Sequence, residues 1–169
     1  MNKDHHQNIV VGVSGSPASR NALSWAADEA TSRQARLRVV RVWNPVRHGA
    51  PYARVGTLPT CDEERTEACD GLTAAVRAEF GPVPPGDVTV ELAEGVPERV
   101  LVDRSAGADL LVLGMATPAW LTGRSPGPVV RTCLARSRCP VAVIGGTGQT
   151  SPSGNKAVRQ NAAPQPATA

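Results

Sequence analysis

Aromatic residues are scarce in this chain of 169 residues, which holds three Trp, one Tyr and one Phe, or 3% in all. Among the cations of the final third, Trp120 is the only aromatic residue, so no platform for base stacking is visible and nucleic acid is not the expected partner. No apolar run approaches ~18 residues, which argues against a membrane-spanning helix. The polar residues 1–8 lead directly into a strand-like run, so we expect no secretory signal and a cytoplasmic location.

Cysteine and histidine are also few. The chain has four Cys and three His, too few Cys for a disulfide scaffold at this size and with no pair at metal-binding spacing. Cys61 and Cys69 stand eight residues apart, which places both on one face of a predicted helix. The histidines fall in the N-terminal segment and in a predicted loop, so we expect neither a metal centre nor a histidine-based catalytic site.

Acidic residues are absent beyond Asp109. Residues 1–109 hold 12 basic and 15 acidic side chains, a net charge of −3, whereas the whole chain carries +3. The final third should therefore attract anions, and a small phosphate ligand suits it better than a polymer. Its six cations are Arg124, Arg131, Arg136, Arg138, Lys156 and Arg159.

Short apolar runs alternate with helical patterns along the chain. This alternation predicts an α/β fold with a five-stranded parallel sheet and helices on both faces, similar to a Rossmann fold. We expect one domain over residues 1–146 and a disordered tail, rich in Gly, Ser, Pro and Ala, over residues 147–169. The predicted strands are 8–13, 37–43, 88–92, 108–113 and 140–144, and the helices begin at Pro17, Asp62, Gly95 and Pro128.

In such sheets a ligand binds beyond the carboxyl ends of the strands, where the strand order reverses. Two loops should meet there, one over residues 13–16 and the other over residues 114–127. The second loop contains Arg124 and opens onto a helix N-terminus, whose amides and dipole favour a phosphate. The alternative is that the glycines of these loops only serve tight turns and that Arg124 is a solvated surface charge.

Three segments resemble the universal stress protein family. Residues 10–19 (VVGVSGSPAS) look like the opening of that family, and residues 111–114 (LVLG) and 139–143 (CPVAV) look like its close. The nucleotide motif of the family is Gly, two residues, Gly, nine residues, Gly, then Ser or Thr. The positions of that motif are occupied here, at the same spacing, by Gly114, Thr117, Gly127 and Pro128.

The resemblance implies a homodimer through the last strand and, in some members, bound ATP. A nucleotide would place its base near Val13, Ser14 and Val42 and its phosphates over Thr117, Arg124, Gly127 and Val129. The alternative is a dimerising stress or interaction protein without nucleotide. That alternative draws on three departures from the ATP-binding pattern, which are Thr117 for Gly, Pro128 for Ser or Thr, and Ser14 for Asp. No residue stands out as catalytic, so we expect a binding module and no enzyme.

Overall fold

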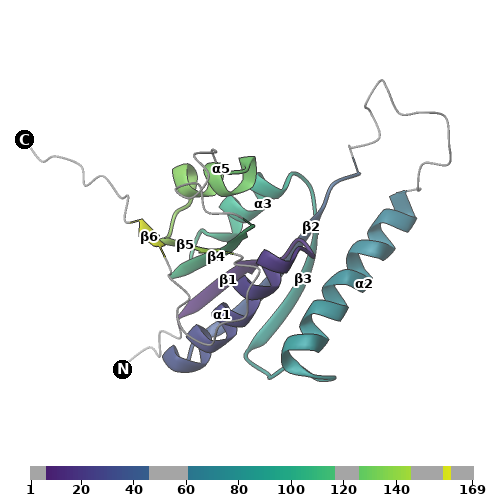
Figure 1. Cartoon of the computed structure of the whole chain (residues 1–169), viewed down its shortest axis with the longest axis horizontal. Coiled ribbons are helices and arrows are strands. Elements are labelled where there is room, and N and C mark those ends of the chain that lie inside the picture. Colours follow the sequence, from purple (N-terminus) through teal and green to yellow (C-terminus); the bar gives the residue numbers. More distant parts are fainter. Residues whose placement is uncertain (1–6, 46–60, 117–125, 146–157, 161–169) are drawn as a thin grey trace, which may run out of the picture.

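The computed structural model describes residues 7–45, 61–116, 126–145 and 158–160 (Figure 1). The loop predicted after the second strand lies mostly outside these residues, as do the middle of the loop after the fourth strand and most of the C-terminal segment. The strands are β1 (Asn8–Gly12), β2 (Arg36–Trp43), β3 (Val88–Glu94), β4 (Leu110–Met115), β5 (Val141–Gly145) and β6 (Val158–Gln160). The helices are α1 (Pro17–Arg33), α2 (Cys61–Phe80), α3 (Pro97–Arg104) and α5 (Pro128–Arg136).

The sheet has the strand order β3-β2-β1-β4-β5-β6. Its first five strands pair in parallel, which confirms the predicted five-stranded parallel sheet. The sixth strand, β6, pairs antiparallel with β5 and falls inside the segment 147–169 that was expected to lack regular structure. Three residues are too short a run to show a strand periodicity, and β6 forms because the outer edge of β5 offers unpaired main-chain groups.

The helices lie against the two faces of the sheet (Figure 1), and two apolar clusters hold them there. One cluster lies between the sheet and the helices α1 and α2, and the other lies between the sheet and the helices α3 and α5. Successive residues of each strand point to opposite faces, so the buried strands read as continuous apolar runs. In β1, for example, Val11 belongs to the α1/α2 cluster and Val10 to the α3/α5 cluster.

Helix α1 packs through small side chains. Ser16 is its N-cap and accepts a hydrogen bond from the Ser19 amide at 3.2 Å, and Pro17 occupies the first helical position, where no amide hydrogen is needed. The helix ends at Gln34, whose φ of 52° lies in the left-handed region. Four alanines at four-residue spacing form the buried stripe of this helix, namely Ala18, Ala22, Ala26 and Ala30.

The first turn of α1 touches the main chain of β4 at Gly114. A Cβ built on Gly114 would lie 2.6 Å from the Ser19 nitrogen and closer still to the Ala18 carbonyl. Real Cβ atoms do not approach backbone so closely, so only glycine permits this contact. Gly114, the first glycine of the motif in the sequence, thus lets helix α1 approach the sheet closely.

We expect Gly114→Ala to destabilise the fold by about 3 kcal/mol, because the added methyl meets backbone atoms that cannot rotate away. The free energy of unfolding in urea measures the effect. Gly86→Ala is the control, since a Cβ on Gly86 meets nothing within 4 Å, and its effect should stay within ~0.5 kcal/mol. Equal stability of the two variants would contradict the tight α1–β4 contact.

Candidate functional site

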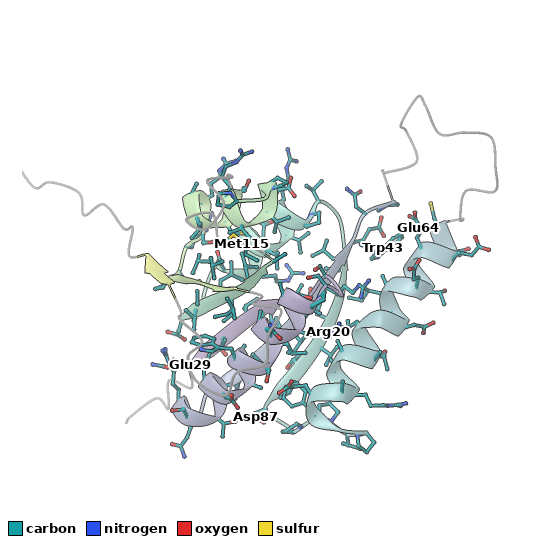
Figure 2. All side chains as sticks on the ribbon, in the orientation of Figure 1. Arg20, Glu29, Trp43, Glu64, Asp87 and Met115 are labelled. Carbon is teal, nitrogen blue, oxygen red and sulfur yellow. The ribbon has the colours of Figure 1, made fainter. Side chains whose placement is uncertain are left out.

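The strand order reverses between β1 and β4, which pair directly in the middle of the sheet. Gly12 of β1 lies opposite Leu113 of β4, so the two chains leave the sheet side by side after these residues. Figure 2 shows Trp43 and Met115 at this end of the sheet and Asp87 at the opposite end. The switch point therefore lies where the sequence predicted it, at the carboxyl ends of the strands.

The loop between β1 and α1 forms one side of the switch point. Val13 is buried in the α1/α2 cluster, and its amide donates to the Val40 carbonyl at 2.9 Å. Ser14 is exposed, and its hydroxyl donates to the Ser16 hydroxyl at 3.1 Å. This loop presents hydroxyl groups and no carboxylate, and the Ser16 hydroxyl already serves the first turn of α1.

The N-terminus of α5 behaves differently from that of α1. Its N-cap is Gly127, which has no side chain to accept from the first turn, and a Cβ at Gly127 would meet nothing within 4 Å among the described residues. Pro128 at the first helical position has no amide hydrogen. The first hydrogen bond of the helix runs from the Arg131 amide to the Gly127 carbonyl, at 3.0 Å. The amides of Val129 and Val130 come before this bond and point out of the helix end. Together with the helix dipole, they form a place for an anion.

Besides Ser14, Gly127 and Pro128, described above, the predicted site residues fall into three groups. Val42 and Val129 are half-buried and pack against the α3/α5 cluster, as does Met115 at the end of β4. Val13 and Gly114 face α1 on the other side of the sheet. Thr117 and Arg124 lie outside the described residues. The structure therefore gathers Val42, Met115 and Val129 on one face.

A groove that the sequence did not predict lies on the other face, between the β1–α1 loop and the first half of α2. It has a volume of about 810 Å³. Arg41 of β2 projects into it, between two glycines. A Cβ built on Gly15 would lie 3.3 Å from Arg41 Nη1, and a Cβ built on Gly71 would lie 3.1 Å from Arg41 Cζ. A glycine inside a helix costs about 1 kcal/mol relative to alanine, so Gly71 marks the place where the guanidinium needs room. The groove is lined by Gly15, Arg41, Asp62, Glu63, Thr66, Glu67, Asp70, Gly71 and Ala74.

The charge of this groove argues against a nucleotide in it. Among the described residues that line it are four carboxylates and one guanidinium, that of Arg41, so this lining carries a net negative charge. Arg41 and Val42 are consecutive residues of one strand and thus point to opposite faces of the sheet. The groove is therefore separate from the site next to α5.

The part of the chain that the structure describes shows no cluster of metal ligands, and two of its four thiols are largely buried. No group of three or more His, Cys, Asp or Glu side chains there could hold a metal ion. Burial raises the pKa of both Cys133 and Cys139 to about 11, so these thiols stay protonated at neutral pH. Cys61 and Cys69 are exposed and lie on α2.

Comparisons with known proteins agree with this architecture. The model of the universal stress protein family matches residues 5–145. The chain belongs to this family. Universal stress protein Rv2005c of Mycobacterium tuberculosis is 34% identical over 143 residues, which cover 82% of this chain and 45% of that protein. The chain thus spans about half the length of the curated relatives that it matches.

Solved structures of universal stress proteins share the fold. The universal stress protein UspA from Lactobacillus plantarum has a TM-score of 0.61 and 21% identity, covering 82% of this chain and 97% of that one. The Archaeoglobus fulgidus protein described as a complex with dAMP has a TM-score of 0.56 and 24% identity, covering 82% and 97%. The Rossmann-like assignment made from the sequence is confirmed.

The four thiols should differ sharply in reactivity. At pH 7.5 we expect Cys61 and Cys69 to react with a disulfide reagent at least ~100-fold faster than Cys133 and Cys139, because burial and a raised pKa both suppress the thiolate. Peptide mass spectrometry after timed labelling measures each rate. Labelling in denaturant, where all four should react alike, is the control, and rapid labelling of Cys133 in the native protein would contradict its placement.

Proposed function

We propose that this chain is a stress-response module that binds ATP or a related adenine nucleotide at the switch point between β1 and β4. The phosphates would lie at the N-terminus of α5, and the base would lie toward Val42 at the end of β2. The observation that carries this proposal is the open first turn of α5, with the outward amides of Val129 and Val130.

The contrast between two helix ends supports this placement. Both α1 and α5 begin at the carboxyl end of the sheet, yet the first turn of α1 is capped by the Ser16 hydroxyl, whereas no side chain of the described residues caps that of α5. An anion is therefore better accommodated at α5 than at α1. The exposed Arg131 in the same helix and the lack of acidic residues after Asp109 favour an anion at this side of the molecule.

The relatives give this ligand class a precedent. The Archaeoglobus fulgidus protein is described as a complex with dAMP, and it shares its fold with this chain. The argument for this chain rests on its own residues. Pro128 and Ser14 each take away a group that could hold a nucleotide, so we expect affinity in the millimolar range.

The proposed role is binding without catalysis. None of the helices in the described part of the chain is both long and apolar enough to span a bilayer. Hydrolysis would need a base or a metal near the terminal phosphate, and the sequence has no carboxylate after Asp109. We infer a non-enzymatic module that works in the cytoplasm and forms a homodimer through β5.

A second candidate is a dimerising interaction protein with no nucleotide. Pro128 is the observation that favours it, because the first position of α5 then offers neither a hydroxyl nor an amide hydrogen. In this case the fold is kept as a scaffold and the first turn of α5 has no ligand.

Substitutions at Pro128 should restore donors one at a time. Pro128→Ala adds an amide hydrogen, and Pro128→Ser adds an amide hydrogen and a hydroxyl. A hydrogen bond to a charged phosphate is worth roughly 1.5–3 kcal/mol, so we expect ATP affinity to rise about 10-fold in the first variant and further in the second. Isothermal titration calorimetry with ATP and Mg²⁺ at moderate salt measures each affinity.

Arg41→Gln is the matched control, because Arg41 lies in the separate groove and its loss should leave ATP affinity unchanged.

The double variant Thr117→Gly with Pro128→Ser separates the two candidate functions. Affinity present in the parent chain supports the nucleotide module, whereas affinity that appears only in this double variant supports the nucleotide-free protein. Absence of binding in every variant at millimolar ATP would overturn the placement at α5.

A further inference from the structure

The two edges of the parallel sheet differ in chemistry. At one edge, β3 carries Glu91 and Glu94, and the Glu91 carboxylate accepts from Arg104 Nε at 2.9 Å. At the other edge, β5 reads VAVIG, has no charged residue, and is buried from Val141 to Ile144. Charged residues discourage an edge strand from pairing with another chain, and a short apolar strand invites such pairing. The β5 edge is thus the one built for strand addition.

The segment that covers β5 is short. β6 pairs with β5 over three residues, Val141 opposite Gln160, Ala142 opposite Arg159 and Val143 opposite Val158. The last two residues of β5, Ile144 and Gly145, lie beyond this pairing, although both pair with β4 on the inner side. Twelve residues, 146–157, connect the two strands.

We propose that β6 is a displaceable cover on the β5 edge, and that its release lets β5 pair with β5 of a second copy of this chain. The inference rests on the dimer proposed above and adds to it a competitor within the same chain. The main-chain groups of β5 that now pair with β6 are the same groups that would pair with the second copy. The two pairings therefore exclude each other.

The direction of pairing makes the exchange possible. β6 runs antiparallel to β5, and two copies of β5 related by a two-fold axis would also run antiparallel. The second copy can therefore use the same hydrogen-bonding geometry that β6 uses now. It offers five residues where β6 offers three, and it joins two apolar strands in one continuous sheet.

The energetic balance favours a cover that opens readily. Each hydrogen bond of β6 contributes only about 0.5–1.5 kcal/mol, and closing a connection of twelve residues opposes it entropically. β6 must leave β5 in both copies before the two copies pair. The fraction of copies with a released β6 therefore enters the dimer affinity as its square. If the cover is closed in about nine copies of ten, it weakens dimerisation about 100-fold.

The test is the full chain with Val158→Pro and Gln160→Pro together, which removes two amide donors from β6 and leaves β5 intact. Ala162→Pro together with Ala163→Pro is the control, since it adds the same two prolines beyond β6. Sedimentation velocity over a range of about 1 to 200 µM gives the dimer dissociation constant of each protein. We expect it to fall about 100-fold in the β6 variant and to stay at the parent value in the control.

Hydrogen exchange of residues 141–145 identifies the edge that is used. In the β6 variant we expect these amides to exchange faster than in the parent at low concentration and slower at high concentration, when the second copy covers them. Dimers of equal affinity in the parent and the β6 variant would leave the proposed dimer standing and overturn the cover. Parent and variant that are both monomeric throughout would overturn the dimer and the cover together, and a dimer without slowed exchange at β5 would overturn β5 as its interface.

Discussion

The contact between the first turn of α1 and the main chain of β4 is the constraint on which the rest of the site depends. Gly114 allows α1 to lie against β4, and the alanine stripe of α1 continues this close packing along the sheet. The contact fixes where the chain leaves β1 and where α1 begins, and it also fixes the end of β4. A larger residue at position 114 would move the two sides of the switch point apart, whatever ligand lies between them.

At the carboxyl end of the sheet, the two faces carry electrostatic fields of opposite sign. On the α1/α2 face, the first half of α2 contributes four carboxylates to the groove that contains Arg41. On the α3/α5 face, α5 directs its first amides outward and carries the exposed Arg131 next to its first turn. An anion at this end of the molecule is therefore attracted toward α5 and repelled from α2. The orientation proposed for a nucleotide follows from this difference as well as from the helix dipole.

Much of the fold could be read from local patterns. The buried run of β1, the Ser16 cap followed by Pro17, and Pro128 at the start of α5 each depend on neighbouring residues only, and each is confirmed. Three features depend on residues far apart in the chain and could not be read in this way. β6 is too short for a periodicity, Gly114 meets α1 across the sheet, and Arg41 fills a space that Gly71 leaves. Arg41, a charged residue within the otherwise apolar run Val39–Trp43, was the local signal for the groove.

The β4–β5 ladder connects the proposed ligand site with the proposed dimer edge. Gly114 pairs with Ile144 and Met115 pairs with Gly145, so the last residues of β4 and β5 lie next to each other. The inner edge of β5 thus supports the residue from which the ligand loop departs, and its outer edge receives β6 or a second copy. One strand of five residues therefore has both neighbours, and a single ladder of hydrogen bonds joins it to the end of β4. If both proposals hold, double-mutant cycles between the two sites would measure any coupling that this ladder carries.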